Sequence, residues 1–291
     1  MPLFDVNIDA TCGNARALTF ETAHGTVHTP MFMPVGTHAT VKGVTTPQLR
    51  ELNSQVVLAN TYHLYMRPGV DIIEKAGGVQ KFMNYDGPML TDSGGFQLFS
   101  LDHMMKTDPD GVTFHARDYD GSKHRWTPES NMDIQQRIGA DIVMQLDQCI
   151  GYPSPKEAVA ASTKLSWEWA ERCCAAHTRE DQALFAIVQG GMYRDLRLES
   201  AKRLIEIDAA SRAAGHKGFQ GFGIGGYSVG EPHEVMFETL GAVAQALPQD
   251  RPRYLMGVGN PTTLVRAVRE GVDMFDCVLP TRTARMGTAF S

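Results

Sequence analysis

The chain has few cysteines, and their spacing indicates neither a disulfide framework nor a metal site. Five cysteines occur among 291 residues, and no pair shows Cys-x-x-Cys spacing. A protein stabilised by disulfides usually has an even number of cysteines, and structural zinc sites usually contain closely spaced pairs of cysteines. We therefore expect free thiols, no metal ligands and no cofactor held within this chain.

The sequence also lacks long apolar runs and the pattern of a signal peptide near its N-terminus. No stretch of eighteen apolar residues occurs, and the opening residues lack a basic segment followed by an apolar core. The sequence therefore indicates neither a membrane span nor a secretory signal. With 43% hydrophobic and 21% charged residues, the sequence predicts one globular cytoplasmic domain over residues 1–291, with no membrane partner.

Basic charge is scarce over the whole chain. The net charge is −6, which argues against a protein that coats nucleic acid, because phosphate binding draws on Lys and Arg. The segment from Arg251 to Ser291 differs, since it carries six arginines and only three acids. A local basic face could therefore still contact an RNA backbone.

Eight short apolar runs with polar or glycine-rich ends recur along the chain. Continuous Val, Ile, Leu and Met runs are typical of parallel strands buried on both faces, and amphipathic stretches separate most of them. Eight such units predict an α/β fold, a (β/α)8 TIM barrel. The runs lie near Met31, Val56, Pro88, Ala140, Leu184, Gly221, Arg253 and Met274.

The segments between these runs predict the remaining elements. Helical spacing predicts helices over Pro155 to His177, with Ser154 as N-cap, and over Leu196 to Ala214. The Asp120-Gly121 pair predicts an inserted β-hairpin before a helix that starts near Thr127. Residues 1–27 are expected to form strands that cap one end of the barrel.

The carboxyl ends of barrel strands carry function, so the polar residues there are the candidate site. Asp92 and Asp276 are two carboxylates suited to chemistry at a glycosidic carbon. Asp147 could accept hydrogen bonds from N1 and N2 of a guanine, while Gln189 and the Gly226 N–H could donate to O6. Phe96 and Met256 would cover the faces of the ring.

Six motifs in a fixed order resemble one family. They are NTYHLYMRPG (60–69), TDSGGFQ (91–97), VQGG (188–191), IGGYSVGEP (224–232), YLMGVGNP (254–261) and MFDCVLPTRTAR (274–285). Together they resemble the tRNA-guanine transglycosylases, also called queuine tRNA-ribosyltransferases, of the bacterial type. The resemblance extends from near the N-terminus to the last residue.

The resemblance implies a pentosyltransferase of queuosine biosynthesis. Such an enzyme replaces guanine at wobble position 34 of tRNAs with GUN anticodons, which accept aspartate, asparagine, histidine or tyrosine. Asp276 would be the nucleophile that forms a covalent tRNA intermediate, and Asp92 the proton acceptor for the incoming base. The target base must leave the anticodon stack first.

The resemblance also implies two sets of binding residues. Those for the base are Asp92, Ser93, Gly94, Gly95, Phe96, Asp147, Gln189, Gly225, Gly226 and Met256. Those for RNA are Gly257, Val258, Gly259, Asn260, Pro261, Thr262, Thr263, Thr281, Arg282, Thr283, Ala284 and Arg285.

The sequence departs from the family pattern in several places. Members usually continue into a zinc subdomain with a Cys-x-Cys-x-x-Cys and a later His, which also supports a homodimer; these ligands are absent here, so structural zinc is expected only with them. Gln148 stands where Glu is usual, Asn260 where Lys is usual, and Tyr227 where Leu is commoner. Cys149 and Val229 favour 7-aminomethyl-7-deazaguanine (preQ1) over bulkier queuine as the inserted base.

Several alternatives stay open from the sequence. The chain could insert queuine, or be a truncated inactive form or a non-catalytic tRNA-binding partner subunit. It could also be a barrel glycosidase or nucleosidase that acts on a small substrate, although Arg282 and Arg285 would then have no obvious role.

Overall fold

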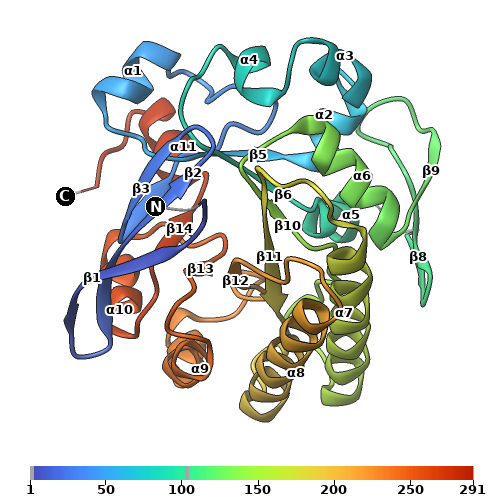
Figure 1. Cartoon of the computed structure of the whole chain (residues 1–291), viewed down its shortest axis with the longest axis vertical. Coiled ribbons are helices and arrows are strands. Elements are labelled where there is room, and N and C mark those ends of the chain that lie inside the picture. Colours follow the sequence, from blue (N-terminus) through green and yellow to red (C-terminus); the bar gives the residue numbers. More distant parts are fainter. Residues whose placement is uncertain (1–2, 102–104, 291) are drawn as a thin grey trace.

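Eight parallel strands form the centre of the molecule (Figure 1). The computed structural model describes residues 3–101 and 105–290, so residues 1–2, 102–104 and 291 of the expected domain lie outside it. A bridge between Val35 and Leu58 joins the first strand to its far neighbour and nearly closes the sheet into a barrel. The predicted TIM barrel is confirmed. Its strands are β4 (Met31–Met33), β5 (Val57–Asn60), β6 (Met89–Asp92), β10 (Ile142–Met144), β11 (Ala183–Val188), β12 (Gly221–Ile224), β13 (Arg253–Leu255) and β14 (Met274–Asp276).

Helices connect the strands and surround the barrel (Figure 1). The two predicted outer helices are α7 and α8, within a residue or two of their expected bounds. The expected N-cap at Ser154 is wrong: Pro155 occupies the cap position, and the Ser154 hydroxyl donates to the Gly151 carbonyl instead. The helices are α1 (Thr46–Glu51), α2 (Thr61–Met66), α3 (Val70–Lys75), α4 (Val79–Met83), α5 (Gly95–Leu101), α6 (Pro128–Ile138), α7 (Lys156–Ala176), α8 (Arg194–Ala213), α9 (His233–Ala246), α10 (Pro261–Arg269) and α11 (Leu279–Arg285).

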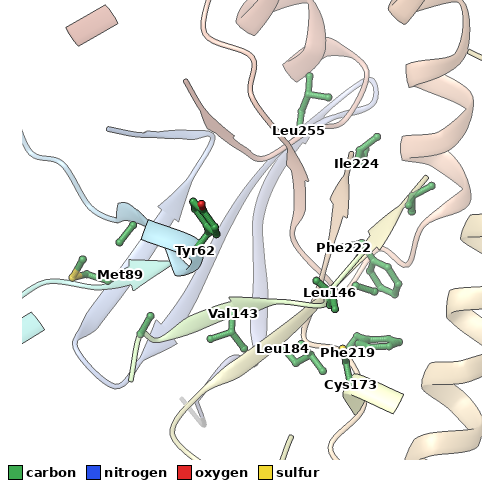
Figure 2. Close-up of a cluster of buried hydrophobic side chains, with 14 of the residues drawn as sticks. Tyr62, Met89, Val143, Leu146, Cys173, Leu184, Phe219, Phe222, Ile224 and Leu255 are labelled. Atoms are coloured by element: carbon green, nitrogen blue, oxygen red, sulfur yellow. The ribbon is translucent and has the colours of Figure 1, made fainter. Parts of the chain in front are cut away.

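Alternation along each strand divides the apolar side chains into two layers. On β11, Phe185 and Ile187 belong to the cluster inside the barrel, whereas Leu184 and Val188 belong to the cluster between sheet and helices. Figure 2 shows part of this outer cluster, where Leu184 lies among Phe219, Phe222, Cys173 and others. Both faces of the strand are buried, which is why its sequence is continuously apolar.

Glycines on β12 make room for large side chains inside the barrel. A Cβ at Gly221 would come within 2.3 Å of the Phe185 ring, and one at Gly223 within 2.8 Å of Met144 Cε. Only glycine leaves space for these neighbours at close packing density.

An antiparallel N-terminal sheet covers the end of the barrel where the strands begin. It consists of β1 (Val6–Cys12), β2 (Ala15–Thr22) and β3 (Gly25–Thr29). Arg16 of β2 forms a buried bidentate ion pair with Asp273, the residue before β14. Its Nε donates to Oδ1 at 3.0 Å and its Nη2 donates to Oδ2 at 2.6 Å. The predicted cap is confirmed, and it leaves the opposite end of the barrel open.

A second antiparallel sheet is inserted between β6 and α6. It contains β7 (Lys106–Asp108), β8 (Gly111–His115) and β9 (Lys123–Trp126), so the predicted hairpin around Asp120-Gly121 has one further strand. Thr127 caps α6 with a capping box, as the predicted start of that helix requires. Near the hairpin turn, loop residues Asp118 and Tyr119 reach back to α2.

Candidate functional site

The open end of the barrel holds a cavity of about 550 Å³ lined by residues from the carboxyl ends of the strands. Asp92, Asp147, Gln189, Met256 and Asp276 all face it. The base-binding candidates Ser93, Gly94, Gly95, Phe96, Gly225 and Gly226 line it too. Tertiary structure thus brings together residues that lie up to 184 positions apart, from Asp92 to Asp276.

Asp276 ends β14 and is held through only one of its two oxygens. Its Oδ1 accepts from the Tyr254 hydroxyl at 2.6 Å and from the Gly257 N–H at 2.7 Å. Its Oδ2 has no hydrogen-bond partner among residues 3–101 and 105–290. Burial raises the pKa of this carboxyl, while the bonds from Tyr254 and Gly257 oppose the rise. The arrangement leaves one carboxylate oxygen available to react.

Asp92 ends β6 beside a set of donors from the neighbouring strand. Asn60, at the end of β5, donates through Nδ2 to both carboxylate oxygens at 2.9 and 2.7 Å. The Gly94 N–H donates to Oδ1 at 3.1 Å. Burial raises the pKa of Asp92 to about 7; the negative charge of Asp276 adds to the rise, and the bonds from Asn60 oppose it. A carboxyl with this pKa can give or take a proton near neutral pH.

Asp147 follows β10, and among the described residues its carboxylate accepts hydrogen bonds from neutral side chains alone. Gln189 Nε2 donates to its Oδ2 at 2.7 Å, and the Ser93 hydroxyl donates to its Oδ1 at 3.2 Å. Burial raises its pKa, which these two bonds oppose. A buried carboxyl without a cationic partner is suited to accept N–H groups from a neutral polar ring.

Two glycine segments border Asp147 and Gln189 because side chains would not fit there. A Cβ at Gly95 would lie 2.7 Å from Asp147 Oδ1, and one at Gly226 would lie 2.3 Å from Gln189 Oε1. Gly226 also has φ +67°, a conformation that favours glycine. These segments bring backbone groups up to the ligand space.

A buried arginine, Arg197 of α8, fixes the loops around the pocket. Its guanidinium donates to the carbonyls of Gly191 at 2.5 Å, Gly225 at 3.0 Å and Gly226 at 3.2 Å. It also lies over the Tyr227 ring at 3.5 Å. One side chain therefore joins the loop after β11 to the loop after β12.

The predicted RNA-binding residues fall into two groups with different exposure. Arg282 and Arg285 on α11 are exposed, and Arg282 lines the cavity. Arg285 donates to the Lys42 carbonyl at 3.1 Å. In the other group, from Gly257 to Thr263, the side chains of Val258 and Thr263 are buried. Backbone groups rather than these two side chains would face an RNA there.

Asn260 has a structural role in the same loop. Its Oδ1 accepts from the Thr262 N–H at 3.1 Å and caps α10. Pro261 and Thr262 are exposed, Gly259 is buried, and on α11 Ala284 is exposed while Thr281 and Thr283 are half-buried.

Sequence reasoning missed two residues that hold the carboxylates, Asn60 and Tyr254. Asn60 ends a predicted strand and Tyr254 lies within one, so their positions in NTYHLYMRPG and YLMGVGNP were the available signals. His63, Cys149 and Val229 also line the cavity.

Metal binding has no support within the described chain. No group of three or more His, Cys, Asp or Glu side chains there could hold a metal ion, and its five cysteines are free thiols. The zinc that the family resemblance implies is expected only together with the further Cys and His ligands of the zinc subdomain. Among the helices described, none has the length and apolar content needed to cross a membrane.

An eight-stranded barrel with two carboxylates and a polar recognition pocket at its open end defines a barrel enzyme site. The family described as queuine tRNA-ribosyltransferase matches residues 10–291. A queuine tRNA-ribosyltransferase of Desulforamulus reducens is 54% identical over 277 residues, covering 95% of this chain and 72% of the relative. One from Thermoanaerobacter sp. strain X514 is 53% identical over 279 residues, covering 96% and 72%. The chain belongs to this family.

Proposed function

We propose that this protein is a tRNA-guanine transglycosylase that exchanges guanine at the wobble position of tRNA for a 7-deazaguanine base. The observation that carries the proposal is the pair Asp276 and Asp92, which line one cavity but have different hydrogen-bond environments. Family membership and the names of the relatives point to the same activity. Because its substrate is tRNA, the reaction would take place in the cytoplasm.

In the first displacement, Oδ2 of Asp276 attacks C1′ of the target nucleotide. A bond forms between that oxygen and C1′ as the bond from C1′ to N9 of guanine breaks. Guanine leaves with the electron pair and takes up a proton from solvent water. Asp276 must be ionised to attack. The bonds to its Oδ1 favour the ionised form and leave Oδ2 for the sugar.

In the second displacement, the incoming base takes the place of guanine. Asp92 accepts the proton from its ring nitrogen, which attacks C1′ and releases the Asp276 carboxylate. Two inversions at one carbon retain its configuration. The pKa of about 7 suits Asp92 to this exchange of protons near neutral pH.

The pocket residues would recognise the base by its hydrogen-bonding edge. Asp147 would accept from N1 and N2, while Gln189 and the Gly226 N–H would donate to O6. Gln189 is bonded to Asp147 at 2.7 Å, so the two side chains are already positioned next to each other. Phe96 and Met256 line the same cavity and would cover the ring faces.

We further propose preQ1 as the inserted base, with tRNAs of aspartate, asparagine, histidine and tyrosine as acceptors. Val229 and Cys149 line the cavity and restrict the space beyond the base. A Val229→Gly variant should therefore accept bulkier queuine better than the unchanged chain does. Arg282 and Arg285 would hold the RNA backbone, and the protein would act as a homodimer.

The test is incorporation of labelled guanine into a tRNA with a U-G-U anticodon-loop sequence, without added zinc. The expected result is incorporation, with an RNA adduct that Asp276→Asn abolishes. Tight tRNA binding without exchange would support a non-catalytic partner subunit instead. Release of base from free nucleosides would favour a nucleosidase.

A further inference from the structure

A cluster of two histidines and one tyrosine lies at the edge of the cavity, outside the carboxylate pair. The Tyr119 hydroxyl is 2.7 Å from Nδ1 of His63 and 2.9 Å from Nε2 of His38. The rings of His38 and His63 have centroids 5.0 Å apart. Of the three, His63 lines the cavity.

The three residues come from separate parts of the fold. His63 lies on α2 after β5, His38 on the loop after β4, and Tyr119 on the loop that joins β8 to β9. Within that loop, the N–H groups of Tyr119 and Gly121 both donate to the Ala116 carbonyl. The inserted sheet therefore places a hydroxyl against a residue of the cavity wall.

A tyrosine hydroxyl has one proton, so Tyr119 can donate to only one of the two imidazoles. The other imidazole must donate to the tyrosine oxygen. If Tyr119 donates to Nδ1 of His63, both histidines carry their proton on Nε2, the usual tautomer of a neutral imidazole. His63 then presents an Nε2–H donor, for which the part of the chain in the structure offers no partner.

The surroundings keep the cluster neutral. Burial lowers the pKa of His63, with neighbouring His38 adding and Asp118 opposing, and burial and Arg67 lower the pKa of His38. Burial raises the pKa of Tyr119, so its hydroxyl stays protonated. A neutral donor binds oxygen without the desolvation cost of a charged one.

Hydrogen bonds through Asn60 also connect His63 to Asp92. The backbone N–H of His63 donates to Asn60 Oδ1 at 3.0 Å, and Asn60 donates to Asp92. His63 is thus next to the residues that act at C1′. C1′ is bonded to the base and is itself part of the ribose. Because Asp147 and Gln189 of the same cavity are assigned to the base, the sugar and its phosphates are the part of the substrate left for a donor beside Asn60.

We propose that His63 binds, through Nε2, an oxygen of the sugar–phosphate backbone at the target nucleotide, and that Tyr119 is the positioning residue that orients it. This inference rests on the proposed base exchange. It assigns to the inserted sheet a part in substrate binding, because Tyr119 belongs to that sheet's connecting loop.

The test compares Tyr119→Phe and His63→Phe with the unchanged chain in guanine exchange. Both variants should raise the KM for tRNA roughly three- to tenfold, the effect of one hydrogen bond, and leave the KM for guanine within about twofold. Tyr119→Phe keeps the ring and loses only the hydroxyl. An unchanged KM for tRNA in both variants, or equal changes for tRNA and guanine, overturns the proposal.

Single-atom changes in the RNA identify the oxygen. One RNA hairpin carries a 2′-deoxy sugar at the target nucleotide, and another a methylphosphonate at its phosphate. The unchanged chain should lose affinity for one of these, and His63→Phe should show no such loss. If neither change weakens binding to the unchanged chain, His63 does not bind the backbone there.

Two further readouts separate this inference from the proposed activity. The Kd for tRNA, measured without turnover, gives the same comparison of variants even if the unchanged chain exchanges no guanine. Imidazole ¹⁵N shifts report the tautomer of His63, which should be Nε2–H and should change in Tyr119→Phe. A His63 that carries its proton on Nδ1 overturns the assigned donor.

Discussion

The hydroxyl of Tyr254 donates a 2.6 Å hydrogen bond to Oδ1 of Asp276, a residue that lines the cavity. Burial raises the pKa of this carboxyl, and the bond from Tyr254 opposes that rise. Burial, with the negative charge of Asp276 adding, raises the pKa of Tyr254 well above its ordinary value, so the phenol remains the donor. Tyr254 therefore both orients the candidate nucleophile and favours its ionised form.

Removing this hydroxyl should slow the reaction through the nucleophile. For Tyr254→Phe we expect kcat to fall roughly ten- to hundredfold near neutral pH, the cost of a hydrogen bond to a charged group. Because the pKa of Asp276 rises further without the bond, activity should recover partly at higher pH. Steady-state kinetics over a pH series measures both effects.

Tyr85→Phe is the matched control for that variant. Tyr85 is also buried, and its hydroxyl donates to the Ser54 carbonyl outside the cavity at 2.5 Å. Its loss should cost stability and leave kcat unchanged. Equal kcat in Tyr254→Phe and Tyr85→Phe would remove Tyr254 from the mechanism.

The pH dependence of base exchange should report Asp92. Its pKa is about 7, and it accepts a proton only when ionised. Turnover at saturating tRNA should therefore rise as pH increases through about 7 and level off above it. In Asp92→Asn the overall rate should fall at least roughly hundredfold. A variant that retains full turnover would reassign Asp92 to structure.

Asp92 should also destabilise the folded chain at alkaline pH. Its folded pKa is raised from 3.8 to about 7, so the folded state binds the proton more tightly than the unfolded state. The resulting stability is fully present below about pH 4 and is lost as pH rises through 7. Asp92→Asn should then melt higher than the unchanged chain by about 2 °C or more at pH 8.

The two melting temperatures should converge well below pH 4, where Asp92 is protonated in both the folded and the unfolded state. Asp71→Asn serves as the control, because Asp71 is exposed and paired with Arg137 on the surface. It should show no comparable gain at pH 8. A pH-independent difference for Asp92→Asn would contradict the burial of an ionising group.

A methyl group at Gly226 should obstruct the base pocket. Its Cβ would lie 2.3 Å from Gln189 Oε1, and φ is +67°. Gly226→Ala should displace Gln189 and raise the KM for guanine roughly tenfold or more, with a smaller change in the KM for tRNA. Initial rates measured while the concentrations of labelled guanine and of tRNA are varied independently give the two KM values separately.

Gly13 offers a control with the same backbone strain. Its φ is +60°, and a Cβ there would meet nothing within 4 Å. Gly13→Ala should lose the stability that an alanine at positive φ costs, and the same backbone cost applies in Gly226→Ala. Only Gly226→Ala adds a clash with a pocket side chain. If both variants raise the KM for guanine, the effect comes from strain rather than from the pocket.

Several parts of the fold were predictable because their signals are local. Most residues of the barrel strands are apolar, and β11 is a continuous apolar run buried on both faces, as that pattern requires. Thr127 and Asp120-Gly121 mark a helix start and a hairpin turn within a few residues. Ser154 failed as a predicted cap because Gly151, three residues earlier, accepts its hydroxyl instead.

The sequence by itself thus determined the barrel, its inserted hairpin and the two carboxylates at strand ends, because periodicity and turn residues act over short distances. Only the tertiary structure decided that Tyr254 donates to Oδ1 of Asp276. It also decided that Tyr119 contacts His63, which lies 56 residues earlier in the chain. It also buried Val258 and Thr263 within a predicted RNA-binding segment. These contacts depend on how the strands align when the sheet closes, and no local pattern encodes that alignment.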